Sequence, residues 1–205
     1  MNKIGIFDYG SGNFTSVWNA VCSITSDVIS IKNPDDINKC THLILPGVGT
    51  FGNVMERLKR LNFITAIENA VIIEKKQYLG ICVGMQILAD YGTEFGHHKG
   101  FGFIKGAVDK INMDGKNCAL PHMGWNNLED FENTPLLKDI DPDATFYFVH
   151  SYCFIPQDLL LPFVKTDCGT IFCSAISVNN IHGVQFHPEK SQLYGLQLLQ
   201  NFIRL

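Results

Sequence analysis

The sequence predicts an α/β fold built on a mixed, mostly parallel central sheet flanked by helices. Over residues 1–92, short apolar runs alternate with segments of helical spacing, and this alternation is typical of parallel strands joined by right-handed crossovers. In the second half, strand-like segments separated by short turns indicate partly antiparallel pairing. We expect one domain over residues 1–205, because a chain of 205 residues that is 46% hydrophobic can bury one sizeable core.

The first half contains four predicted strands, which are KIGIFD (3–8), DVISIK (27–32), HLILP (42–46) and YLGIC (78–82). A helix is predicted over residues 15–22, after a Gly-rich turn. A longer helix is predicted over residues 51–76, where apolar side chains recur at helical spacing: Met55, Leu58, Leu61, Ile64, Ile67 and Val71. GMQILADY (84–91) is expected to form another helix.

The second half contains six strand-like segments, which are FIKGAVDKI (103–111), NCALP (117–121), TFYFVHS (145–151), LPFVKT (161–166), IFCSAIS (171–177) and NIHGVQF (180–186). The last segment, YGLQLLQNFIRL (194–205), carries an apolar helical stripe of Tyr194, Leu198 and Phe202, with Leu199 and Ile203 beside it. This stripe predicts a closing helix that packs back on the sheet.

Composition excludes several classes of partner. The formal net charge is -4, and without clustered Lys and Arg we expect neither a nucleic-acid nor a membrane partner. No apolar run is long enough to span a bilayer, so a cytosolic protein is expected. Seven scattered cysteines without CxxC spacing suggest reduced thiols, most of them inert core residues, with no metal site and no cofactor: Cys22, Cys40, Cys82, Cys118, Cys153, Cys168 and Cys173.

The stretch GICVGMQIL (80–88) raises the possibility of a nucleophile. Cys82 lies between Gly80 and Gly84, where a predicted strand gives way to a predicted helix. The start of a helix favours a thiolate, and the glycines would permit the sharp turn of a nucleophile elbow. For an isolated cysteine, however, inert packing is the commoner role.

Two further segments follow predicted strands and could supply the base and the oxyanion-binding groups that a nucleophilic thiol needs. In GVQFHPEKS (183–191), His187 could act as base, with Glu189 orienting it across Pro188, because residues two apart in extended backbone face the same way. Taken alone, this segment is more often a surface turn. In LPGVG (45–49), backbone N–H groups of Gly47, Val48 and Gly49, with that of Val83, could form an oxyanion hole.

Together, these three segments resemble the class I glutamine amidotransferases. The resemblance implies a flavodoxin-like fold in which Cys82 attacks the side-chain amide of L-glutamine and His187, paired with Glu189, passes the proton to the departing ammonia. It also implies a set of residues that hold the amino-acid head of glutamine, namely Gln86 and Glu94, helped by backbone around His150, Ser151 and Tyr152.

Six segments together are similar to the glutaminase subunits of imidazole glycerol phosphate synthase: IFDYGSGNFTSV (6–17), LPGVGTFG (45–52), KGFGFIKG (99–106), PHMGWN (121–126), FYFVHSY (146–152) and GVQFHPEKS (183–191). The resemblance implies a heterodimer with a (β/α)₈-barrel cyclase that receives ammonia. The residues it would place toward that partner are Asn13, Met123, Trp125 and Lys190.

Three alternatives stay open at the level of sequence. Ser11, Phe14, Thr15 and Val83 depart from the usual pattern of those subunits, which leaves room for a diverged paralogue that supplies ammonia for amidation of a surface sugar. A second alternative is a non-catalytic assembly subunit whose cysteine is vestigial. The third is a free-standing thiol hydrolase that acts on another amide.

Overall fold

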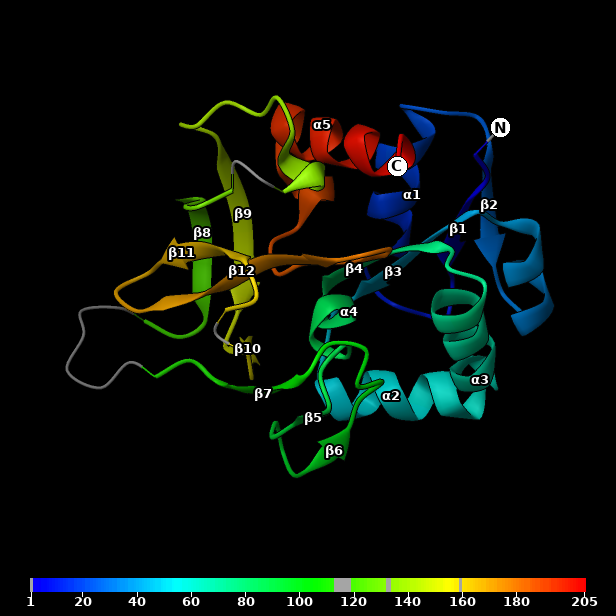
Figure 1. Cartoon of the computed structure of the whole chain (residues 1–205), viewed down its shortest axis with the longest axis horizontal. Helices are drawn as coiled ribbons and strands as arrows, with labels where there is room; N and C mark the ends of the chain where they lie inside the picture. Colours follow the sequence, from blue (N-terminus) through cyan, green and yellow to red (C-terminus); the bar gives the residue numbers. More distant parts are fainter. Residues whose placement is uncertain (1, 113–118, 132–133, 159) are drawn as a thin grey trace.

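A seven-stranded sheet runs through the middle of the molecule (Figure 1). The computed structural model describes residues 2–112, 119–131, 134–158 and 160–205. In spatial order the strands are β11 (Phe163–Asp167), β12 (Ile171–Val178), β13 (Ile181–Val184), β4 (Gln77–Cys82), β3 (His42–Gly47), β1 (Ile4–Phe7) and β2 (Val28–Ile31). The five strands from β13 to β2 are parallel and follow the flavodoxin order. The predicted fold class is therefore confirmed.

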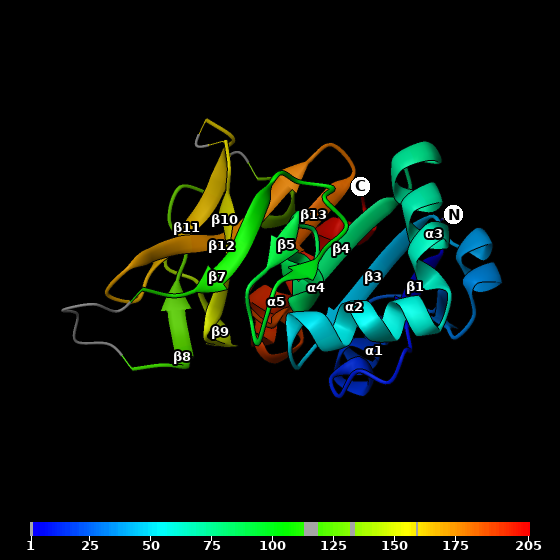
Figure 2. The same ribbon diagram turned by 90° about the horizontal axis from the view of Figure 1, so that it is seen from below.

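Helices cover both faces of this sheet. Helices α1 (Phe14–Cys22) and α5 (Gln192–Ile203) lie on one side, and α2 (Phe51–Arg60) and α3 (Phe63–Glu68) lie on the other, as Figure 2 also shows. Every residue of β1 and β3 is buried, which explains why the parallel strands are continuous apolar runs. Asn2 Nδ2 donates to the backbone oxygen of Ile203 at 2.8 Å, so the two chain ends lie side by side.

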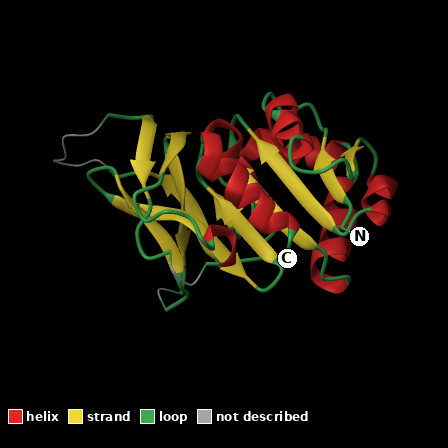
Figure 3. Cartoon of the chain, turned by 90° about the horizontal axis from the view of Figure 1, so that it is seen from above, coloured by secondary structure: helices red, strands yellow, loops and turns green. Residues whose placement is uncertain are grey.

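One half of the molecule consists mostly of strands and the other half carries most of the helices (Figure 3), and two smaller sheets accompany the main sheet. One contains β10 (Tyr152–Pro156), β7 (Gly106–Lys110), β5 (Tyr91–Gly92) and β6 (His98–Lys99), and the other pairs β8 (His122–Asn127) with β9 (Thr145–His150). Most of this pairing is antiparallel, as predicted for the second half. Short 3₁₀ helices span Pro34–Lys39, Pro135–Leu137 and Pro188–Lys190.

Several strand assignments were wrong, because β5, β6, β8 and β10 were not predicted as strands. Strand β8 was missed because its apolar residues Met123 and Trp125 face outward and its more buried positions are His122, Gly124 and Asn126, the reverse of the usual pattern of a half-buried strand. NCALP was predicted as a strand, but Ala119, Leu120 and Pro121 belong to none, and positions 117 and 118 lie outside the described residues. Among the described residues, no helix has the length and apolar character needed to cross a membrane.

The long helix predicted over residues 51–76 is interrupted. Asn62 adopts a left-handed conformation, with φ of 60°, and separates α2 from α3; asparagine tolerates this region better than most residues. A π-helix over Asn69–Ile73 then continues from α3. At the break Leu61 is 40% exposed, whereas the periodic pattern predicted that it would face the core.

The helix predicted over residues 84–91 is also shorter than expected. Helix α4 spans only Val83–Gln86. The carbonyls of Ile87, Leu88 and Ala89 accept hydrogen bonds from the backbone N–H groups of Phe101, Ile104 and Gly102, respectively. These partners from a distant segment replace the hydrogen bonds that would have continued the helix. The predicted helices at residues 15–22 and 194–205 are confirmed, with starts one and two residues earlier.

Candidate active site

The three segments singled out in the sequence meet at one edge of the main sheet. They follow β3, β4 and β13, which are neighbours and parallel, so their carboxyl ends lie together. Gly47 at the end of β3 lies opposite Cys82 at the end of β4 in the strand register. His187 comes three residues after Val184, the last residue of β13. The sheet therefore brings the predicted nucleophile and base to the same place.

Cys82 occupies a strained turn between β4 and α4. Its φ of 55° and ψ of -110° lie in a region that non-glycine residues rarely adopt, and this strand-to-helix turn has the form of a nucleophile elbow. The flanking glycines serve close packing rather than the bend itself. A Cβ atom at Gly80 would overlap the carbonyl of Gly84, and one at Gly84 would overlap the carbonyl of Leu45.

Gly84→Ala is expected to destabilise the fold by about 1 to 3 kcal/mol or more, because the added methyl group meets main chain that cannot easily move. This overlap outweighs the roughly 0.5 to 1 kcal/mol that alanine gains over glycine in a helix. Gly12→Ala is a matched control, since its Cβ would approach only the side chain of Val48. Chemical denaturation measures both, and a wild-type midpoint for Gly84→Ala would contradict this account.

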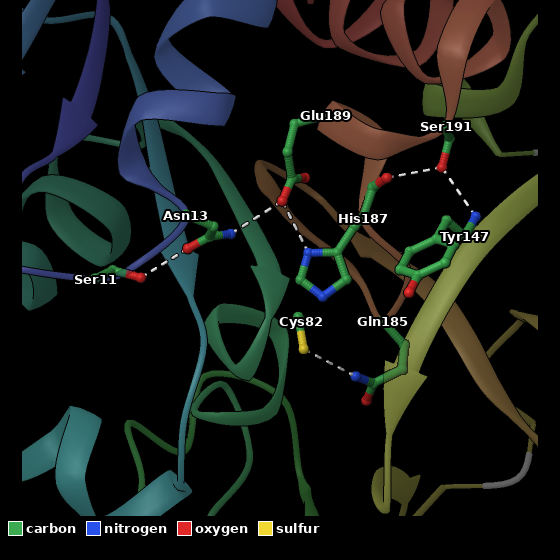
Figure 4. A network of polar contacts seen from close by, with 8 residues as sticks. All are labelled: Ser11, Asn13, Cys82, Tyr147, Gln185, His187, Glu189 and Ser191. Atoms are coloured by element: carbon green, nitrogen blue, oxygen red, sulfur yellow. Dashed lines mark hydrogen bonds and ion pairs between the residues drawn. The ribbon is translucent and has the colours of Figure 1, made fainter. Parts of the chain in front are cut away.

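His187 and Glu189 form a buried pair, as predicted. His187 Nδ1 lies 2.8 Å from Glu189 Oε1, and neither side chain is exposed. The same carboxylate oxygen accepts a hydrogen bond from Asn13 Nδ2 at 3.1 Å, and Ser11 Oγ donates to Asn13 Oδ1 at 2.7 Å (Figure 4). The backbone after His187 turns into the 3₁₀ helix at Pro188–Lys190 instead of staying extended, yet the pair still forms.

The other ring nitrogen of His187 points toward the sulfur of Cys82 (Figure 4). Burial alone lowers the pKa of His187, but interactions with the Cys82 sulfur and the Glu189 carboxylate outweigh burial and raise the pKa to about 10. The imidazole of His187 therefore favours its protonated form. Cys82, His187 and Glu189 thus form one charge-coupled unit, which is what a thiol nucleophile with its base requires.

A cavity of about 230 Å³ opens directly on this unit. Its lining includes Val48, Gly49, Cys82, Val83, Gln86, Glu94, Val149, His150, Ser151, Tyr152 and His187. Every residue that was predicted to bind glutamine is present in this lining. Of the four predicted oxyanion residues three line the cavity, while Gly47 lies behind them against Gly84.

The polar groups of the cavity leave two oxygen atoms suited to an ammonium group. Gln86 Nε2 donates to the backbone oxygen of Tyr152 at 2.9 Å and to Gln185 Oε1 at 3.0 Å, so its own side-chain oxygen is the atom left to accept. Glu94 Oε2 accepts from the N–H of Phe51, the first residue of α2, at 3.0 Å. One carboxylate oxygen of Glu94 and one amide oxygen of Gln86 can therefore receive an amino-acid ammonium group.

Comparison with known proteins decides the family. The family model for class-I glutamine amidotransferases matches residues 5–205 of the chain. The chain belongs to the class-I glutamine amidotransferases. The imidazole glycerol phosphate synthase subunit HisH of Zymomonas mobilis is 41% identical to it, covering 98% of this chain and 95% of the relative. Subunit HisH 1 of Campylobacter jejuni (strain RM1221) is 45% identical, covering 98% and 100%.

Solved structures agree with this assignment at the level of the fold. The structure of PurLQS from Thermotoga maritima matches with a TM-score of 0.75 at 19% identity, covering 100% of this chain and 99% of that chain. A crystal structure of a glutamine amidotransferase matches with the same TM-score at 15% identity, covering 98% and 99%.

Strand β8 connects the surface of this amidotransferase to its cavity. Met123 and Trp125 are 62% and 47% exposed, whereas His122, between them and the cavity, is half-buried. Burial lowers the pKa of His150 to about 3, so its ring is neutral, and its Nδ1 donates to the backbone oxygen of Tyr152. His150 Nε2 can then accept from His122 Nδ1, at 3.2 Å.

The four residues predicted to face a partner lie in different settings. Met123 and Trp125 are exposed, and so is Lys190, whose Nζ lies 5.5 Å from the centre of the Tyr147 ring. Asn13 is only 4% exposed and hydrogen bonds to Glu189. Its side chain therefore holds the Glu189 carboxylate, which in turn contacts His187.

Gln185 was not identified from the sequence. Its side chain is fully buried, and its Nε2 donates to the Cys82 sulfur at 3.5 Å. A partial signal was available, because Gln185 is a polar residue inside the apolar strand predicted over residues 180–186 and lies two residues before His187. In the structure the strand ends at Val184 and the chain bends at residues 185 and 186.

The other described cysteines differ from Cys82 in their surroundings. Burial raises the pKa of Cys40 to about 11 and that of Cys153 to about 12, and it also raises the pKa of Cys173 well above its ordinary value. These thiols stay protonated, as expected for core residues. Cys22 is exposed, whereas Cys40, Cys153, Cys168 and Cys173 are buried, in keeping with the expectation that most of the cysteines are core residues. Cys118 lies outside the described residues.

Proposed function

We propose that this chain hydrolyses L-glutamine to glutamate and ammonia as the glutaminase subunit of imidazole glycerol phosphate synthase. The observation that carries the proposal is the cavity shared by Cys82 and His187, with Gln86 and Glu94 in its wall. Family membership and the HisH relatives support the same reaction. The proposal takes residues 1–205 as one amidotransferase domain.

The reaction proceeds in two steps. The Cys82 thiolate attacks the side-chain amide carbon of glutamine, N–H groups of Val48, Gly49 and Val83 hold the oxyanion, and a proton from His187 accompanies the departing ammonia. The C–N bond breaks as the C–S bond of a thioester forms. His187 then removes a proton from water, which attacks the thioester, so that the C–S bond breaks and glutamate leaves.

Substrate binding uses the rest of the cavity. Gln86 and Glu94 hold the α-ammonium group through their free oxygen atoms, as the hydrogen-bond pattern of the cavity allows. Backbone of His150, Ser151 and Tyr152 packs against the amino-acid head. The reaction needs no cofactor, because the thiol supplies the nucleophile and the imidazole moves the protons.

The ammonia passes to a (β/α)₈-barrel cyclase, which forms imidazole glycerol phosphate and an aminoimidazole carboxamide nucleotide in histidine biosynthesis. We place this heterodimeric partner against Met123, Trp125 and Lys190, since exposed aromatic and Met side chains are typical interface anchors. Asn13 does not face the partner directly, and it acts through its hydrogen bond to Glu189. We place the complex in the cytoplasm, where the thiols of the described cysteines stay reduced.

The decisive experiment measures glutamine hydrolysis by the chain alone and with the cyclase and its nucleotide acceptor. We expect roughly 5- to 150-fold stimulation, the usual range for coupling between two sites, because β8 joins the exposed Trp125 to His150 in the cavity wall. Trp125→Ala should reduce the stimulation, and Trp18→Ala, on helix α1, is the matched control. Equal activity with and without the partner would contradict the proposal, and stimulation only with a sugar acceptor would favour the paralogue.

A further inference from the structure

The side chain of Gln185 is hydrogen bonded to two residues that line the cavity, Cys82 and Gln86. Its backbone N–H donates to the carbonyl of Ser174 at 2.8 Å, which holds it against β12, and its side chain is fully buried. Its amide reaches Cys82 with one end and Gln86 with the other. Figure 4 shows the amide nitrogen of Gln185 pointing toward the Cys82 sulfur.

The hydrogen bonds fix which atom of each amide faces which neighbour. The backbone oxygen of Tyr152 only accepts, so the amide nitrogen of Gln86 must face it. The second N–H of that nitrogen then points at Gln185, which must present its oxygen. The nitrogen of Gln185 is consequently left for the Cys82 sulfur. Each amide therefore has one orientation that satisfies its buried atoms.

We propose that Gln185 is a positioning residue with two roles, stabilising the Cys82 thiolate through Nε2 and holding Gln86 through Oε1 so that the Gln86 oxygen faces the glutamine ammonium group. The proposal rests on the glutaminase function above and deepens it. Gln185 thereby links Cys82, the residue before helix α4, to Gln86, the last residue of that helix. The nucleophile and the amide that holds the substrate are both hydrogen bonded to the same side chain.

The chemistry of the site favours a neutral donor at this position. A hydrogen bond to an anionic acceptor is stronger than one between neutral groups, and more so in a buried cavity. The bond is therefore strongest to the free thiolate and weaker to the neutral thioester sulfur. An amide supplies this donor without introducing a second positive charge beside His187.

Gln185→Glu separates the two roles, because the new carboxylate can still accept from Gln86 but presents an anionic oxygen to the sulfur instead of a donor. In the complex with the cyclase, we expect kcat for glutamine to fall at least about 10- to 150-fold, the range for a lost hydrogen bond to a charged group. KM should change less than about threefold if binding is retained. Alkylation of Cys82 by iodoacetamide at neutral pH, followed by mass spectrometry, should slow by about 10-fold or more.

Gln185→Leu removes both roles and should raise KM as well as lower kcat. Gln157→Glu, at an exposed position, is the charge-matched control and should leave all three quantities unchanged. Circular dichroism of each variant and size-exclusion chromatography of its complex with the cyclase report whether the variant has folded and docked.

The outcomes separate this inference from the proposed function. A wild-type complex that does not hydrolyse glutamine overturns the proposed function itself. A wild-type complex that is active, with wild-type kcat and alkylation in Gln185→Glu, overturns only the role of Gln185 at the sulfur. An unchanged KM in Gln185→Leu, with a folded complex, overturns the role of Gln185 in holding Gln86.

Discussion

Cys82→Ala is expected to lower glutamine-dependent turnover of the complex by at least about 10,000-fold, while synthesis from free ammonia continues. The thiol is the atom that forms the thioester, and loss of the nucleophile removes the covalent route altogether. Ammonia supplied from solution bypasses the cavity, so the partner's reaction does not need Cys82. Both rates are measured with the same complex, by adding either glutamine or an ammonium salt.

A second buried thiol provides the control for this experiment. Cys173 is 2% exposed and lies on β12, away from the cavity lining. Cys173→Ala should cost on the order of 1 kcal/mol of stability and keep glutamine-dependent turnover. Turnover of glutamine that persists in Cys82→Ala would refute the nucleophile and favour the non-catalytic alternative, in which the cysteine is vestigial.

Glu189→Gln is expected to lower kcat by about 1,000- to 10,000-fold. Glu189 Oε1 accepts from both His187 Nδ1 and Asn13 Nδ2, and it thereby holds the imidazole in the tautomer that leaves the other nitrogen for Cys82. An amide can place its NH₂ group against His187 and reverse that tautomer, which is costly in comparable triads. Steady-state kinetics with the complex measure the loss. Glu68→Gln, at an exposed position on α3, should retain wild-type rates.

The same variant should lower the pKa of His187 from about 10, because the carboxylate charge favours the imidazolium. The sign of the linked stability follows from this direction. A folded-state pKa above the ordinary value of 6.5 contributes stability that is fully present below that value and is lost as the pH rises through about 10. In Glu189→Gln the free energy of unfolding should therefore decrease less between pH 6.5 and about 10. An unchanged His187 titration by NMR would contradict the role of Glu189.

Much of the fold was predictable because the pattern of apolar residues in a segment reflects which of its side chains are buried. Continuous apolar runs identified β1, β3 and β4, since strands covered by helices on both faces have no polar side. The interruption at Asn62 was not predictable in this way. The helical spacing of apolar residues continues through residues 51–76. The left-handed conformation of Asn62 that divides the helix leaves no trace in that spacing.

Predicting the triad from the sequence depended on a different kind of signal. Gly80 and Gly84 mark a place where backbone must approach backbone, and the segment HPE places His187 and Glu189 two residues apart. These requirements are local, so short stretches of sequence retain them. The meeting of Cys82 with His187 was a hypothesis until the parallel pairing of β4 with β13 placed both at one sheet edge.

By itself, the sequence determined the α/β class and the positions of the main strands along the chain, and it singled out Cys82, His187 and Glu189 as candidates. Only the tertiary structure decided that Gln185, 103 residues from Cys82 and 99 from Gln86, bridges the two, and that Asn13 lies behind Glu189. The physical reason is that a hydrogen bond between distant residues depends on strand order and register. Those are set by packing of the whole sheet and by no single stretch of the chain.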